Sequence, residues 1–189
     1  QALTTAQIAS LTSNQIAALE TADLAALSQE QVIALSGAQP TALTTAQIAS
    51  LPTSQIATLL TADLATLTTA QIAAFTTAQV QALTLEQIPA LTTAQIRALD
   101  TADVAVLSAE QVVNLTTAQV AALTTAQVAA LTTDQLGKLT VAQVASLETA
   151  DVAVLTSDQL SALTTAQIQD LTSEQFQALT TAQLVALDT

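Results

Sequence analysis

The sequence predicts an all-α solenoid, a superhelix in which each eight-residue repeat contributes one very short helix. Three observations favour this fold class. Leucine recurs every eight residues from Leu3 to Leu187 without insertion or deletion, with Phe75 as the only replacement. A helix-capping pattern follows nearly every one of these leucines, and a second apolar residue stands five positions after it. We therefore treat residues 1–189 as a single continuous array of octads.

Each octad has the consensus Leu-Thr-Thr-Ala-Gln-Ile-Ala-Ala, numbered here from the leucine. Position five is Gln or Asp in every complete octad, and position six is Ile, Val, Leu or Phe except at Pro40. A continuous helix turns by about 100° per residue, so a leucine every eight residues would drift by roughly 80° per octad around it. That drift matches neither the seven- nor the eleven-residue coiled-coil repeat. The chain must therefore change direction within each octad.

A capping box supplies this change of direction. Thr at position two and Gln at position five can each satisfy a backbone N–H of the first helical turn, as Thr4 and Gln7 illustrate. We expect a helix of about one and a half turns in each octad, beginning after the Thr and ending near the next Leu. The same structural pairs are predicted at Thr44 and Gln47, Thr92 and Gln95, Thr116 and Gln119, and Thr164 and Gln167.

The apolar positions one and six are predicted to form the core. Leu3 and Ile8 have the spacing of a hydrophobic staple across a helix start. Because isolated helices of this length are unstable in water, stacking of octads must supply the stability. Positions one and six should point inward, with alanines at tight contacts and Thr, Gln and acidic side chains outside. Further predicted core residues are Leu43, Ile48, Leu91, Ile96, Leu115, Val120, Leu163 and Ile168.

A β-solenoid is the main alternative fold, because it also accommodates short repeats and rows of threonine. Positions one and six have opposite parity, however, so a straight strand would direct them to opposite faces. Alanine and glutamine are poor strand formers, and the repeat lacks glycines for corners. The helical solenoid is favoured.

Composition excludes several classes of function. The chain carries fifteen acidic residues against Arg97 and Lys138, for a formal charge of −13, so nucleic acid and anionic membranes are not expected as partners. No apolar stretch is long enough to span a bilayer, and there is no cysteine. Because the chain begins at Gln1, we expect it to be a fragment of a longer protein.

Catalytic, metal-binding and cofactor-binding patterns are absent from the sequence. There is no His, Cys or Tyr, and the only spaced carboxylate pairs are of the type Asp100–Asp103 and Glu148–Asp151. These pairs fit acidic residues near helix N-termini better than acid–base catalysis. No calcium loop or phosphate loop is present. We predict that the protein is not an enzyme and uses no cofactor, metal ion or small-molecule substrate.

Four octads carry Asp instead of Gln at position five. Asp23, Asp63 and Asp103 lie forty residues apart, and Asp151 follows forty-eight residues later. This slower rhythm indicates duplication in blocks of five octads and one of six. Copying history explains it more simply than a function of these Asp residues.

Two resemblances accompany these patterns. Residues 107–113 resemble the opening helix of transcription activator-like effector repeats, but those repeats are longer and basic, so DNA binding does not carry over. The Leu-Thr-Thr-Ala-Gln-Val-Ala-Ala-Leu tracts, as in Leu115 to Leu131, resemble the octapeptide-repeat regions of large bacterial surface or secreted proteins described as adhesin-like or haem-utilisation-like. The second resemblance implies an extracellular or cell-surface location. Haem binding is not supported, because no His, Met, Cys or Tyr ligand exists.

The leading functional hypothesis is an extracellular rod, stalk or filament-forming segment. Its expected partners are copies of itself, associating end to end or laterally, or further repeats of its parent protein. Two alternatives stay open. Threonine pairs such as Thr44 and Thr45 would suit an ice- or surface-binding array, and a superhelical groove would suit a protein-binding scaffold.

Overall fold

The computed structural model describes residues 3–187, and all regular structure in this range is helical. Twenty-one α-helices and two 3₁₀ helices are present in that range, one in each octad. The all-α solenoid predicted from the sequence is confirmed, and the β-solenoid alternative is not supported. Contacts divide the chain into two compact units, Gln1–Ala98 and Leu99–Thr189, and each is described by itself.

The helices of the first unit are short. They are α1 (Thr5–Ala9), α2 (Ser13–Ala17), α3 (Thr21–Ala25), α4 (Gln29–Ala38), η1 (Pro40–Ala42), α5 (Thr45–Ser50), α6 (Thr53–Ile56), α7 (Thr61–Thr66), α8 (Thr69–Ile72), α9 (Thr77–Gln81), η2 (Ile88–Ala90) and α10 (Thr93–Ala98).

The second unit contains helices of similar length. They are α11 (Thr101–Val106), α12 (Ala109–Val113), α13 (Thr117–Ala121), α14 (Thr125–Ala130), α15 (Thr133–Lys138), α16 (Val141–Ala145), α17 (Thr149–Val154), α18 (Ser157–Ser161), α19 (Thr165–Gln169), α20 (Ser173–Gln177) and α21 (Thr181–Leu187).

The bend between successive helices is made by two extended residues, at positions one and two. Leu131 has φ −61° and ψ 136°, and Thr132 has φ −74° and ψ 160°. No residue in the described part of the chain has a positive φ. The bend therefore needs no residue in the left-handed region, which explains how an array of bends contains only two glycines.

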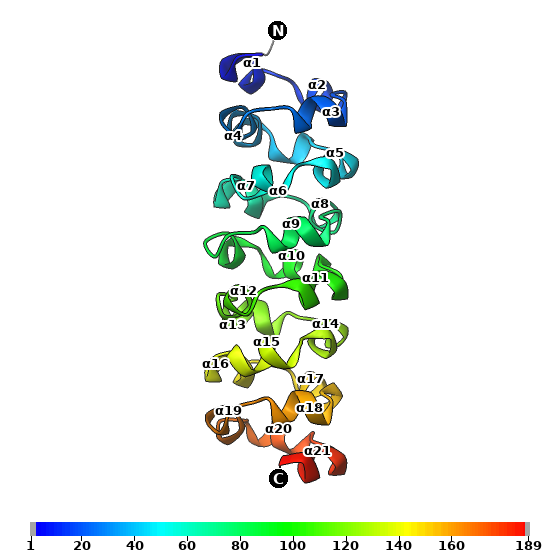
Figure 1. The fold of residues 1–189 in the computed structure, drawn as a ribbon, viewed down its shortest axis with the longest axis vertical. Coiled ribbons are helices and arrows are strands. Elements are labelled where there is room, and N and C mark those ends of the chain that lie inside the picture. Colours follow the sequence, from blue (N-terminus) through cyan, green and yellow to red (C-terminus); the bar gives the residue numbers. More distant parts are fainter. Residues whose placement is uncertain (1–2, 188–189) are drawn as a thin grey trace. The chain divides into compact units, whose positions relative to one another are not determined.

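Each superhelical turn contains three octads. Within the second unit, α11 contacts α14, α12 contacts α15, and α14 contacts α17. The first unit repeats this relationship, since α5 contacts α8 and α6 contacts α9. Thr45 and Thr69, which begin α5 and α8, lie 24 residues apart. Figure 1 shows the helices of each unit following one another around a coil.

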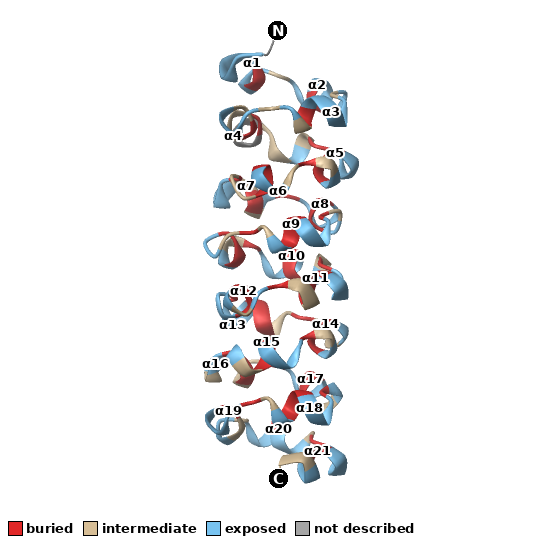
Figure 2. Ribbon diagram, viewed as in Figure 1, coloured by how far each residue is buried: buried red, intermediate tan, exposed pale blue. Residues whose placement is uncertain are grey.

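The core of each unit consists of the side chains at positions one and six. Ile48, Ile96 and Val120 are almost fully enclosed, and Leu43 and Leu115 are also buried. Figure 2 shows buried segments recurring in successive helices, with exposed residues between them. Ile8, Leu91 and Leu163 complete the predicted core residues that are buried.

Two predicted core residues are not buried. Leu3 is 42% exposed, and Ile168 is only partly covered. Both lie in outermost turns, where a side chain is covered from one side by an adjacent turn and not from the other. The prediction from periodicity was wrong here because it treated every octad as an interior one.

Two of the three prolines change the helix type locally. Pro40 and Pro89 lie in the 3₁₀ helices η1 and η2, the only such helices among residues 3–187. Pro52 instead occupies the N-cap of α6, where the missing N–H costs nothing. The octad register continues past all three prolines, because each octad is held mainly by the turns next to it.

Candidate functional site

The glutamines at position five are buried, which corrects the prediction that Gln lies outside. Gln79, for example, is 1% exposed, as little as most of the apolar core. A buried amide must satisfy its hydrogen bonds inside the protein. The buried glutamines are Gln47, Gln55, Gln71, Gln79, Gln87, Gln95, Gln111, Gln119, Gln127, Gln135, Gln143, Gln159, Gln167, Gln175 and Gln183.

Each side-chain amide joins its own helix start to the preceding superhelical turn. In Gln135, Oε1 accepts from the backbone N–H of Thr132 at 2.7 Å. Its Nε2 donates to the backbone carbonyls of Leu107, 28 residues earlier, at 2.7 Å, and of Val104, 31 residues earlier, at 2.9 Å. One side chain therefore caps a helix and binds the turn below it.

This arrangement recurs at the same spacing in both units, and we call it the glutamine ladder. It is formed by the position-five glutamines whose Nε2 donates to a carbonyl of the preceding turn. Within the first unit these are Gln31, Gln39, Gln47, Gln55, Gln71, Gln79, Gln87 and Gln95. Within the second unit they are Gln127, Gln135, Gln143, Gln159, Gln167, Gln175 and Gln183.

The predicted capping pairs all lie at helix starts. Thr44 Oγ1 accepts from the backbone N–H of Gln47 at 3.2 Å, and Gln47 Oε1 accepts from the backbone N–H of Thr44 at 2.8 Å. The same reciprocal pair joins Thr4 to Gln7, Thr92 to Gln95, Thr116 to Gln119, and Thr164 to Gln167. The threonine hydroxyls at position two are thus engaged in capping.

The Asp residues at position five depart from the ladder. Asp23 is exposed and Asp63 is partly buried, but Asp103 and Asp151 are only 2% and 1% exposed. The prediction that acidic side chains lie outside was wrong for these two, because position five points inward whatever residue occupies it. A carboxylate can accept the capping hydrogen bond but cannot donate to a carbonyl.

Burial raises the pKa of Asp103 to about 6, and the nearby Asp100 carboxylate raises it further, against the effect of a backbone hydrogen bond from Asp100. Asp103 Oδ2 accepts from the Asp100 N–H at 3.3 Å, whereas Oδ1 is buried with no hydrogen-bond partner. Burial is also the main cause that raises the pKa of Asp151. A hydrogen bond with the Thr125 hydroxyl and one with the Glu148 N–H oppose this increase.

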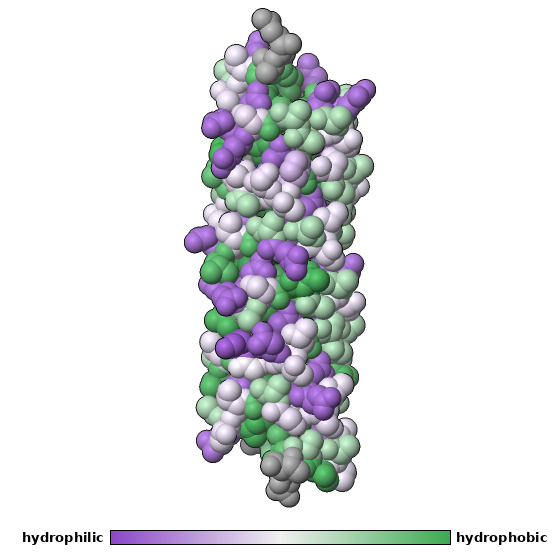
Figure 3. All heavy atoms as spheres, viewed as in Figure 1, coloured by the Kyte–Doolittle hydropathy of each residue, from purple (hydrophilic) through white to green (hydrophobic). Residues whose placement is uncertain are grey.

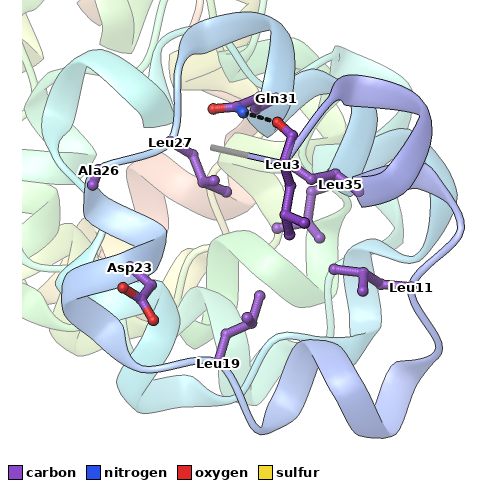
Figure 4. A pocket seen from close by; sticks show the side chains of 9 residues that line it. Leu3, Leu11, Leu19, Asp23, Ala26, Leu27, Gln31 and Leu35 are labelled. Carbon is purple, nitrogen blue, oxygen red and sulfur yellow. Dashed lines mark hydrogen bonds between the residues drawn. The ribbon is translucent and has the colours of Figure 1, made fainter. Parts of the chain in front are cut away.

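Cavities lie in the outermost turns of the two units. A cavity of about 320 Å³ in the first turn is lined mainly by leucines, including Leu3, Leu11 and Leu19. Figure 4 shows these side chains converging on the opening, where Gln31 donates to the backbone carbonyl of Leu3. In the last turn, a cavity of about 540 Å³ is lined by Ile168, Leu171 and other residues of α19 and α20.

No cluster of catalytic or metal-ligating side chains occurs in residues 3–187. Over this range, no three His, Cys, Asp or Glu residues lie close enough together to share a metal ion. None of the described helices has the length and apolar character needed to cross a bilayer. In Figure 3, hydrophilic, neutral and apolar residues are interspersed over the visible face of each unit.

These features define an all-α repeat solenoid, a fold consistent with a structural protein that carries no enzymatic site. The family model of the ALTTAQ repeat matches the chain seven times, over residues 1–27, 16–53, 56–93, 89–117, 112–141, 134–165 and 152–189. The chain therefore belongs to the ALTTAQ repeat family. No curated protein shows significant similarity to it.

Proposed function

We propose that this chain is a non-catalytic spacer, an extracellular rod or stalk that separates other parts of a bacterial surface or secreted protein. The observation that carries the proposal is the constant spacing of the glutamine ladder. Gln47 in the first unit and Gln143 in the second both donate to a leucine carbonyl 28 residues earlier. Every interior turn is thus held by the same bonds to its neighbour.

This uniformity makes length an independently variable property. In an array whose repeats contact only adjacent turns, added octads bring their own core residues and their own ladder bonds. No residue elsewhere has to change. A chain selected for reach rather than for a binding site is expected to have this regularity.

The extracellular location is supported by the resemblance to repeat regions of bacterial surface proteins. The acidic surface, with a formal charge of −13, also favours a dispersed state over adsorption to nucleic acid or anionic lipid. The absence of Cys, Met, Trp, Tyr and His leaves few side chains that oxidation would damage outside the cell.

The proposal is tested by changing the number of turns. Residues 123–146, one complete turn of the second unit, are duplicated once and then twice, and small-angle X-ray scattering gives the maximum dimension of each protein. Equal increments per added turn are expected, with unchanged helicity per residue by circular dichroism. A flexible Gly/Ser insertion of the same length is the control. Increments no larger or more regular than those of the control would contradict a spacer function.

A second measurement addresses the location. The same length series is placed between a bacterial surface anchor and an epitope, and antibody binding to intact cells is measured. Epitope access should rise with each added turn. Access independent of the number of turns would contradict the stalk role.

A further inference from the structure

The glutamine ladder has unused donors at its first turn. Gln7 and Gln15 occupy position five and are exposed, and their Oε1 atoms accept the capping N–H bonds of Thr4 and Thr12, each at 2.9 Å. Their Nε2 groups, however, donate to no acceptor within residues 3–187, whereas Gln31 already donates to the carbonyl of Leu3. The first turn therefore presents two oriented amide donors.

The last turn of the second unit has the complementary vacancy. Leu155 and Leu147 each accept at their carbonyl from a ladder amide, Gln183 at 2.8 Å and Gln175 at 2.7 Å. The equivalent carbonyls of Leu171 and Leu179 accept no hydrogen bond in the described part of the chain. These two carbonyls are eight residues apart, as are Gln7 and Gln15.

Apolar surface accompanies the unused polar groups at both places. The first turn has the leucine-lined cavity of about 320 Å³. In the last turn, Phe176 is 48% exposed and Val185 is 65% exposed, although both are large apolar residues in a chain with few exposed ones. Burying such surface is favourable when the adjoining polar groups find partners.

We propose that a second copy of this chain docks head to tail. The Nε2 groups of Gln7 and Gln15 in one copy donate to the carbonyls of Leu171 and Leu179 in the other. The octad spacing is kept across this junction, and the leucine-lined cavity of one copy covers Phe176 of its neighbour. A head-to-tail contact is heterologous, so it leaves one free surface at each end and builds open filaments. This docking goes beyond the spacer proposal, which stands whether or not the copies join.

The double variant Gln7→Glu with Gln15→Glu removes only the donors. Glutamate keeps the oxygen that accepts the capping bond, so both helix starts are preserved, but it places a carboxylate against the carbonyls of the partner copy. Sedimentation velocity is measured from micromolar to millimolar protein. The parent chain should grow in mass with concentration, and the variant should stay monomeric. The matched control, Thr69→Glu with Thr117→Glu, adds the same charge at exposed helix starts and should associate like the parent.

A mixing experiment tests the direction of docking. The variant Phe176→Gln with Val185→Gln blocks the other surface and should also be monomeric alone. Mixed with the Gln7→Glu, Gln15→Glu variant, it still offers an intact first turn to the intact last turn of its partner. The mixture should form a one-to-one dimer and nothing larger. A parent chain that is monomeric throughout, or association that either blocked variant retains, would overturn the proposal.

Discussion

The side chain of Gln143 joins the backbone of two successive superhelical turns. Its Oε1 accepts from the Thr140 N–H at 2.7 Å, and its Nε2 donates to the Leu115 carbonyl at 2.6 Å. Replacing Gln143 with Leu leaves both backbone groups without these partners, so we expect a loss of roughly 2–4 kcal/mol in the free energy of unfolding. Urea unfolding followed by circular dichroism measures it. The exposed Gln169→Leu is the control and should change stability by less than about 0.5 kcal/mol.

The buried Asp103 should make stability depend on pH. Its folded pKa is raised to about 6 from 3.8, so the folded chain holds this proton more tightly than the unfolded chain. The contribution of Asp103 is then fully present below about pH 4 and lost as pH rises through 6. Asp103→Asn should gain stability relative to the parent at pH 7 and not at pH 3.5. The exposed Asp134→Asn should show no such difference between the two pH values, and an equal gain for both variants would contradict the assignment.

Asp151→Gln should complete the ladder. The carbonyls of Leu123 and Val120 lie 28 and 31 residues before this position, so a Gln amide in the usual place would donate to them. We expect the free energy of unfolding to rise by about 1–2 kcal/mol, measured by calorimetry at neutral pH. The exposed Asp158→Gln controls for loss of charge. A lower unfolding temperature than the parent would mean that this turn has no space for the longer side chain.

Gly137 packs against the backbone of the next turn. A Cβ added at this residue would lie 2.9 Å from the carbonyl oxygen of Ala162. Although Gly→Ala in a helix interior normally stabilises by about 1 kcal/mol, we expect Gly137→Ala to lower the melting temperature by several degrees, because backbone must move to relieve the contact. Ala129→Gly, in the same position of another octad, tests the propensity effect alone. A higher melting temperature for Gly137→Ala would show that the two turns separate easily.

Deletions should be tolerated only in whole octads. Removing residues 115–122 leaves each later Gln 28 residues beyond a position-one carbonyl. Removing residues 115–118 destroys that spacing for every bond that spans the cut. We expect the first deletion to keep parent-like helicity and cooperative unfolding, and the second to lose both in the second unit. Circular dichroism and hydrogen exchange compare the two proteins, and equal behaviour would contradict the role of the spacing.

The octad sequence predicts the helices well because their signals are local. Thr44 and Gln47 are three residues apart, and the periodic leucines report which side is inside. The position of the glutamine was missed because capping explains it within a single octad. Its second role, donation to the turn below, links Gln47 to Leu19, and no local rule contains that 28-residue relationship. The available signal was that position five is always Gln or Asp, although Glu also completes a capping box.

The number of octads per turn was likewise outside sequence reasoning. It depends on how far each bend rotates the chain, and Leu131 and Thr132 have ordinary extended angles that many residues adopt. The burial of Asp103 and Asp151 follows from that rotation and not from their chemistry. Sequence patterns favour acidic residues at helix starts, and the packing of the next turn then covers them.

The constant 28-residue spacing also sets a problem for the chain while it folds. A ladder glutamine such as Gln135 meets nearly the same groups if its turn closes one octad too early or too late, so misaligned states lie close to the native one in free energy. Octads that differ from the consensus, such as those of Pro40 and Pro89, fit poorly in one another's places. These irregular octads therefore mark the correct alignment. An array rebuilt from identical octads would exchange one native pairing for several of nearly equal energy.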